Sequence, residues 1–195
     1  MGGINVDGLD IPVSAGRSVA VVLRSHGSEP PPAGCPQSAT VALASLEPWG
    51  SILNASVQAG FAKEQTVRDL APGRYRLTAS GLGSGCYEVT QPVVDLRGEI
   101  ADPVAVEVAA AGSIHGTLRA GAANVVTLLD AEATDGAQAR LAFPDDQGRF
   151  SFDGLPPGRY KLAAQVPKAT WKEVEVSGGA QASVELPVPP QGAQQ

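Results

Sequence analysis

The sequence FSFDGLPPGRYKLAA, Phe150–Ala164, decides the fold of this 195-residue chain. Phe150 and Phe152 are two residues apart, as are Tyr160 and Leu162, so on extended strands each pair lies on one face. Between the two pairs, glycine adopts backbone conformations closed to other residues, and proline fixes φ and removes a hydrogen-bond donor. The stretch therefore predicts a strand, a tight corner and a second strand.

Tyr160 directly follows the predicted corner. In Greek-key sandwiches, a tyrosine after such a corner hydrogen-bonds through its hydroxyl to the backbone upstream while its ring packs inside. The alternative is an ordinary strand tyrosine that is half-buried and has its hydroxyl in water. The first interpretation predicts a structural role for this side chain.

The stretch has an earlier copy, TVRDLAPGRYRLTAS, at Thr66–Ser80. The two copies are offset by 85 residues, and the same offset relates apolar positions on both sides of the corner. A repeat of this kind indicates two modules of one fold. The residues expected to build the two corners are Leu70, Gly73 and Tyr75 in the first copy and Leu155, Gly158 and Tyr160 in the second.

Further upstream, before Val41 and Val126, the offset grows to 95 residues, the distance from Ser18 to Ser113. The first copy therefore carries ten additional residues, which fall in the proline-rich run Ser25–Ser38. A closing-strand pattern recurs three times, at Leu9–Val13, Val104–Val108 and Val184–Val188. Three closing strands with only two corners predict that the chain begins inside a preceding module.

These patterns predict how the chain is divided. We expect residues 1–16 to be the tail strand of a preceding module and residues 17–110 to be a β-sandwich with a cysteine-containing insert. Residues 111–189 are expected to form the second β-sandwich, and residues 190–195 a disordered tail. The boundary at Ala109–Gly112 is short, so the modules are expected to lie end to end rather than to tumble freely.

The composition favours an all-β protein. The 23 glycines and 16 prolines lie between apolar runs of period two. This pattern predicts two tandem seven-stranded Greek-key sandwiches of the prealbumin-like, Ig-like type. The net charge of −6 disfavours binding to the phosphate backbone of nucleic acids. No stretch approaches the roughly 18 apolar residues of a membrane span, so no transmembrane segment is expected in this chain.

The residue types that carry catalysis or bind metals are sparse. The only histidines, His26 and His115, fall in different modules, and neither is paired with serine and aspartate at a recognisable spacing. Two cysteines and two separated histidines do not supply the roughly four clustered ligands that zinc needs. The pair Asp145–Asp146 is expected to be a solvated turn rather than a calcium site. We therefore expect no catalytic residue, no metal and no cofactor, and hence no enzyme.

Three aromatic residues outside the corners are candidates for stacking on a sugar: Trp49, Tyr87 and Trp171. Trp171 pairs with Cys86 under the 85-residue offset, at a position expected to point inward, so we expect Trp171 in the core. Trp49 stands between proline and glycine and is the one candidate ligand contact expected on the surface.

Cys35 and Cys86 are expected to form a disulfide. Cys35 lies in the insert of the first module and Cys86 on one of its strands, and the second module lacks both. A bridge closing a loop of about 50 residues would stabilise the protein by roughly 4 kcal/mol on the chain-entropy model. It would also place the protein in an oxidising compartment. The alternative is two buried, unpaired thiols in a cytosolic protein.

The stretch GRFSFDGLPPGRYKLAA, with its following tryptophan strand and VEVSGGAQASVELPV, resembles the carboxypeptidase regulatory-like domain. The resemblance implies a seven-stranded, transthyretin-like (prealbumin-like) sandwich, grouped with starch-binding-like sandwiches, that acts as a non-catalytic accessory module. It covers Gly112–Pro189 well and Arg17–Ala110 less strictly. Collagen-adhesin repeats look similar but carry a lysine–asparagine crosslink. The first strands here lack lysine and the closing strands lack asparagine, so no such crosslink is expected.

The expected function is that of a non-catalytic spacer or partner-binding module in a larger exported bacterial protein, in the extracellular space, periplasm or cell envelope. Its expected partners are other modules of the same polypeptide, with a protein or a glycan as further candidates. One alternative is a carbohydrate-binding module that uses Trp49. The other is an accessory domain that positions a catalytic or membrane-barrel domain elsewhere in the polypeptide.

Overall fold

A computed structural model describes residues 15–27, 31–48, 54–100, 102–118, 124–132, 139–165 and 170–187. Trp49, the closing strand expected at Leu9–Val13 and the tail 190–195 lie outside the described residues. Within these ranges every regular element is a β-strand. No helix long and apolar enough to cross a membrane occurs in this part of the chain.

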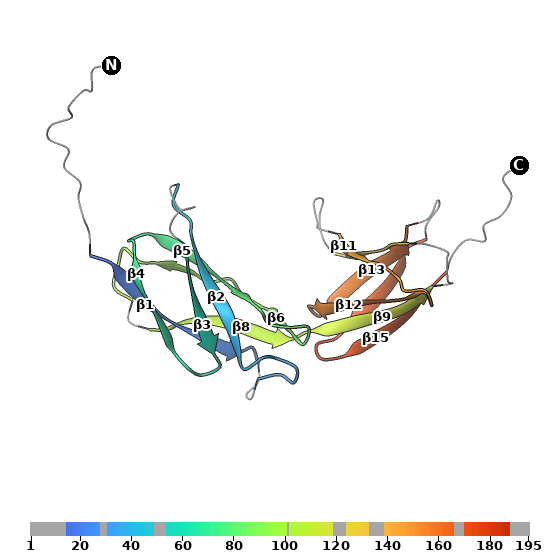
Figure 1. Ribbon diagram of the computed structural model, residues 1–195, viewed down its shortest axis with the longest axis horizontal. Helices are drawn as coiled ribbons and strands as arrows, with labels where there is room; N and C mark the ends of the chain where they lie inside the picture. Colours follow the sequence, from blue (N-terminus) through green and yellow to red (C-terminus); the bar gives the residue numbers. More distant parts are fainter. Residues whose placement is uncertain are drawn as a thin grey trace, which may run out of the picture.

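The first sandwich packs two four-stranded sheets and lies at the left of Figure 1. The first sheet has the strand order β4-β1-β8-β6, and the second has the order β3-β2-β5-β7. The strands are β1 (Arg17–Ser25), β2 (Ser38–Ser45), β3 (Ala55–Gly60), β4 (Gln65–Leu70), β5 (Arg74–Ser80), β6 (Cys86–Glu88), β7 (Val93–Asp95) and β8 (Val104–Ala110).

The second sandwich packs a three-stranded sheet, β12-β9-β15, against a four-stranded sheet, β11-β10-β13-β14. It lies at the right of Figure 1. The strands are β9 (Gly112–Leu118), β10 (Val126–Asp130), β11 (Arg140–Ala142), β12 (Arg149–Leu155), β13 (Gly158–Ala164), β14 (Lys172–Val176) and β15 (Gln181–Leu186). The all-β class and the two tandem sandwiches predicted from the sequence are confirmed.

The pairing pattern makes the two sandwiches equivalent strand by strand. β1 pairs antiparallel with β4 and parallel with β8, just as β9 pairs antiparallel with β12 and parallel with β15. In the facing sheets, β5 lies between β2 and β7, and β13 lies between β10 and β14. β6 has no counterpart among the described strands of the second sandwich. The first sandwich therefore has eight strands where seven were expected.

The additional strand changes the repeat beyond the corner. Tyr160 lies opposite Val174 in β14, and Tyr75 lies opposite Val94 in β7. The offset there is 80 residues rather than 85, so the expected match of Trp171 with Cys86 is wrong. Cys86 is 3% exposed, whereas Trp171 is 47% exposed and lies on the surface rather than in the core. The five residues of difference belong to the connection that carries β6.

Each sandwich has its own apolar core, built from the inward positions of both sheets. The predicted first-core residues Val67, Leu70, Tyr75 and Leu77 are all buried together. The predicted second-core residues are buried in a separate cluster: Phe150, Phe152, Leu155, Tyr160 and Leu162. The rings of Phe150 and Phe152 meet edge to face, with centroids 6.0 Å apart, an arrangement that aromatic pairs prefer.

The two corners close with the same hydrogen bond. The Tyr75 hydroxyl donates to the Ala71 carbonyl at 3.0 Å, and the Tyr160 hydroxyl donates to the Pro156 carbonyl at 2.7 Å. Both acceptors lie four residues upstream of their tyrosine. The tyrosine-corner interpretation is therefore confirmed in both copies, and the alternative with a solvated hydroxyl is not.

A β-bulge precedes each corner. The ladder between β1 and β4 shifts next to Leu70, and the ladder between β9 and β12 shifts next to Leu155. The residue before each of these leucines has a left-handed backbone: Asp69 has φ of 58° and Gly154 has φ of 67°. Glycine adopts this conformation freely, whereas another L-residue pays roughly 1–2 kcal/mol. The first copy thus carries strain that the second avoids.

We expect Tyr160→Ala to lower the free energy of unfolding by about 3–5 kcal/mol, because a large buried aromatic side chain is lost. Tyr160→Phe keeps the ring and removes only the corner hydrogen bond, so its expected cost is about 1 kcal/mol. Urea unfolding of both variants checks this. A Tyr160→Phe variant as stable as the parent would show that the hydroxyl does not hold the corner.

The equivalent bulges predict opposite changes in stability for two substitutions, Gly154→Ala and Asp69→Gly. Gly154→Ala should lower the free energy of unfolding by about 1–2 kcal/mol through backbone strain alone. Steric overlap adds nothing there, because an added Cβ has no neighbour within 4 Å. Asp69→Gly should raise the free energy of unfolding by roughly 0.5 kcal/mol, because the relief of backbone strain outweighs the extra freedom of glycine in the unfolded chain. Equal effects of the same sign would contradict the equivalence of the two bulges.

Candidate functional site

The junction between the sandwiches is one residue long. β8 ends at Ala110 and β9 begins at Gly112, so the closing strand of the first sandwich leads directly into the first strand of the second (Figure 1). The intervening residue, Ala111, is 6% exposed. A linker that is buried and continuous with strands on both sides leaves little backbone freedom between the modules.

Ala111 is hydrogen-bonded to both sandwiches. Its N–H donates to the Gly85 carbonyl of the first sandwich at 2.9 Å. Its carbonyl accepts from the Gly179 N–H of the second sandwich at 3.1 Å. Both polar groups of the linker peptide are therefore satisfied within the protein, and bending the junction would break one or both bonds.

Glycines permit the close approach at this junction. A Cβ at Gly178 would lie 2.9 Å from the carbonyl oxygen of Ala110, and a Cβ at Gly112 would meet the Val176 side chain and the Ser177 carbonyl. A separation under 3.0 Å is shorter than real Cβ contacts, so only glycine fits at either position. The local sequence of the β14–β15 turn is thus suited to receive the end of the first sandwich.

The strand β6, which has no counterpart among the described strands of the second sandwich, forms the edge of its sheet beside this junction. Cys86 lies opposite Ala110, and Tyr87 lies opposite Ala109. β6 also contacts β12 of the second sandwich. Burial raises the pKa of the Tyr160 hydroxyl, with smaller contributions from the nearby Asp130 and, across the junction, Tyr87. The additional strand therefore lies against both modules.

The predicted disulfide is present. Cys35 and Cys86 are bonded with their Cα atoms 5.3 Å apart, across 51 residues of sequence. The backbones on either side are in close contact, because a Cβ at Gly85 would lie 2.5 Å from the Gly34 carbonyl oxygen. The bridge ties the insert of the first sandwich to the strand that lies against the junction.

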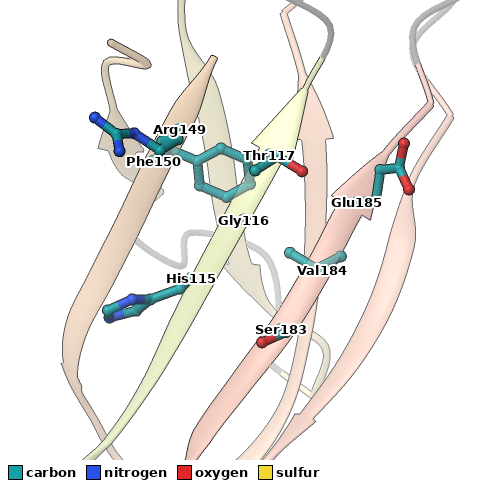
Figure 2. A pocket seen from close by; sticks show the side chains of 8 residues that line it. All are labelled: His115, Gly116, Thr117, Arg149, Phe150, Ser183, Val184 and Glu185. Carbon is teal, nitrogen blue, oxygen red and sulfur yellow. The ribbon is translucent and has the colours of Figure 1, made fainter. Parts of the chain in front are cut away.

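A second candidate site lies on the three-stranded sheet of the second sandwich. A hollow of about 440 Å³ is lined by His115, Gly116, Thr117, Arg149, Phe150, Ser183, Val184 and Glu185. Figure 2 shows how these residues lie on β9, β12 and β15. The strand register sets His115 between Ser151 of β12 and Ser183 of β15. His115 Nε2 lies 3.6 Å from Asp153 Oδ1. The fold thus gathers serine, histidine and aspartate that the sequence analysis did not bring together.

The geometry of this cluster is not that of an activated nucleophile. The Nε2–Oδ1 separation exceeds hydrogen-bond length, and both side chains are about half exposed, at 48% and 44%. The Ser151 hydroxyl donates to Asp153 at 3.3 Å rather than to histidine. In the described part of the chain, His115 forms no hydrogen bond to a serine, which base-assisted attack requires. The cluster is a solvated polar surface of the sheet.

The other residues considered from the sequence, Asp145 and Tyr87, lie in a hairpin turn and at the junction. Asp145 organises the predicted hairpin turn, accepting from the N–H groups of Gln147 and Arg149 and from the Arg149 guanidinium. These donors, the Arg149 backbone first, lower the pKa of the Asp145 carboxyl. No group of three or more possible metal ligands occurs among the described residues. Tyr87 is half-buried at the junction rather than exposed.

The sequence analysis missed a glutamate–arginine contact that occurs beside both corners. The Arg74 backbone N–H donates to Glu47 Oε1 at 3.0 Å, and its guanidinium Nε lies 4.0 Å from the same oxygen. In the second copy the Arg159 guanidinium donates to Glu132 Oε1 at 3.0 Å. Glu47 and Glu132 are related by the 85-residue offset, as are the two arginines. Extending the offset to charged positions would have found them. The junction bonds of Ala111 left no such signal, because they are made by backbone atoms.

Comparison with known proteins finds distant structural likenesses and shows no family for the chain. No protein-family model matches the sequence, so the resemblance to the carboxypeptidase regulatory-like domain gains no support, and no curated protein matches it. Solved structures with a similar arrangement include GBS52, the minor pilin of Streptococcus agalactiae, which is 13% identical with a TM-score of 0.44. That match covers 91% of this chain and 100% of the pilin.

Two further structures match over most of this chain. The Streptococcal ancillary pilin is 13% identical, with a TM-score of 0.45, and the match covers 91% of this chain and 64% of that one. The Bacillus anthracis TIE protein is 14% identical, with a TM-score of 0.35, and the match covers 88% of this chain and 34% of that one. The chain thus spans about a third of the latter. Likenesses this distant carry no argument about function.

Glycine at the junction can be tested against an internal control. Gly178→Ala should lower the free energy of unfolding by roughly 1–3 kcal/mol, because the new methyl group overlaps the Ala110 carbonyl. Gly98 occupies the equivalent turn of the first sandwich, where an added Cβ has no neighbour within 4 Å. Gly98→Ala should therefore be neutral or slightly stabilising. Urea unfolding that finds the two variants equally stable would contradict tight packing at the junction.

Proposed function

We propose that this chain is a non-catalytic structural module, in which two sandwiches form a rigid spacer within a larger exported polypeptide. Its partners are then other modules of the same polypeptide, which it holds at a fixed distance and orientation. The domain boundary of the proposal is Ala111, with residues 17–110 in one sandwich and residues 111–189 in the other.

The observation that carries the proposal is the pair of hydrogen bonds made by Ala111. One bond reaches each sandwich, at 2.9 Å and 3.1 Å, and the residue between them is buried. Relative motion of domains is the default expectation when a linker is free and the interface is small. A linker peptide bonded on both sides removes that freedom, and a fixed geometry is the property that a spacer needs.

The disulfide supports an oxidising compartment. Cys35 and Cys86 are bonded, and bridges of this kind persist in secreted and periplasmic proteins but are rare in the cytosol. The non-catalytic part of the proposal is supported by the polar cluster around His115, where the described contacts leave serine without a hydrogen-bonded base.

The experiment lengthens the junction. Inserting Gly-Gly-Ser between Ala110 and Ala111 should separate the two hydrogen bonds and let the sandwiches move independently. Small-angle X-ray scattering should then require an ensemble of compact and extended shapes, whereas one shape should describe the parent. On heating, the two sandwiches of the variant should unfold in separate transitions. Their folds remain intact because each has its own core.

The matched control places the same insertion in the exposed turn after Asp146, which is remote from the junction. This variant should scatter like the parent apart from the added mass. If the parent itself scatters as a flexible ensemble, or if the junction insertion changes nothing, the proposed spacer function is wrong.

A further inference from the structure

We propose that the Cys35–Cys86 disulfide sets the stiffness of the junction, so that reduction by a dithiol converts the rigid joint into a hinge. This inference rests on the proposed spacer function and adds a condition to it. The bridge would then act on the geometry between the sandwiches in addition to the stability of one of them.

The bridge is one residue away from the junction bond. Gly85, whose carbonyl accepts from the Ala111 N–H, immediately precedes Cys86. Cys86 lies opposite Ala110, the last residue of β8. The position of the accepting carbonyl is therefore determined by where the bridge holds Cys86. On the other side of the bridge, the backbones of Gly34 and Gly85 are in contact.

The described contacts give the junction end of β6 few other anchors. β6 is three residues long and pairs with β8 alone, at the edge of its sheet. The chain that leads into it contains Gly81 and Gly83, both with left-handed backbones and with open space where a side chain would be. Between these glycines, Leu82 is buried in the first core and anchors the connection at that point. The stretch from Leu82 to β6 is exposed at Gly83 and Ser84, so its position is left to the bridge and the Gly85 bond.

The opposite end of β6 is held independently of the bridge. The Glu88 carboxylate accepts from the Ala79 N–H at 2.6 Å, and the Val89 N–H donates to the Glu107 carbonyl at 2.8 Å. Loss of the disulfide should therefore free the junction end of the strand while its far end stays attached. This asymmetry separates loosening of the junction from loss of the first sandwich.

The bridge can be reached by a small reductant. Cys35 is half-buried and its neighbours Ala33 and Gly34 are exposed, whereas Cys86 lies in the core. A dithiol attacks as its thiolate, forms a mixed disulfide with one cysteine and releases the other as a thiol. Its second thiol then closes a cyclic disulfide. Two electrons and two protons pass from the dithiol to the protein, which ends with two cysteine thiols.

Single-molecule energy transfer tests the inference on the full chain. Dyes are attached through ketone-bearing amino acids, which leave the cysteines untouched, at the exposed positions Arg68 in β4 and Thr117 in β9. This pair reports the geometry between the sandwiches. Two control pairs report each sandwich alone: Arg68 with Arg76, and Thr117 with Glu173, each pair spanning the two sheets of one sandwich.

The oxidised protein should give one narrow distribution for the pair between the sandwiches. Dithiothreitol should broaden this distribution and shift its mean, while both control pairs stay narrow. The double variant Cys35→Ala/Cys86→Ala should be broad without reductant and should not respond to it. Thiol titration that finds two free thiols per chain confirms that reduction is complete.

The outcomes distinguish this inference from the function it rests on. A distribution that is already broad in the oxidised protein would refute the rigid spacer itself. A distribution that stays narrow after complete reduction would leave the spacer intact and overturn the inference. Broadening of the control pair in the first sandwich would also overturn it, because the disulfide would then be a plain stabilising bridge.

Discussion

Each sandwich depends on one hydrogen bond, from a tyrosine hydroxyl to a carbonyl four residues upstream, at the point where the chain passes from one sheet to the other. The bond closes a short corner between the two strands, with three residues, Ala71–Gly73, in one copy and two residues, Pro156–Pro157, in the other. Just before the corner, the bulge at Asp69 or Gly154 directs the leucine that follows it into the core.

The sequence predicted those parts of the fold that are marked by side chains recurring in both sandwiches. The tyrosine, the corner glycine and the apolar residues of β4 and β5 recur at one offset in β12 and β13, and they lie where that offset places them. The disulfide was also predictable, because its two cysteines share one module. The offset failed at Trp171, because the first sandwich has five more residues beyond the corner and a strand, β6, without a counterpart among the described strands of the second. An offset counted along the sequence cannot show which sheet an additional segment joins.

The junction was less accessible to sequence analysis. The short boundary predicted modules lying end to end, but the bonds that fix them are made by backbone atoms of Gly85, Ala111 and Gly179. The end of the second sandwich that faces the junction differs in its residues from the equivalent end of the first sandwich. The second sandwich has glycine at 112, 154 and 179, where the first has Arg17, Asp69 and Glu99. At these positions the end that receives a neighbour has no side chains, and the other end has charged ones.

The parallel pairing of first and last strands has a mechanical consequence. A pulling force on the chain enters the first sandwich at the start of β1 and leaves it at the end of β8, and these two strands are direct neighbours running in the same direction. The same holds for β9 and β15 in the second sandwich. Tension therefore loads each of these ladders in shear, so that its hydrogen bonds must rupture together rather than unzip one after another. Because β8 continues into β9 after one residue, the load passes from one sandwich to the other along a nearly unbroken strand.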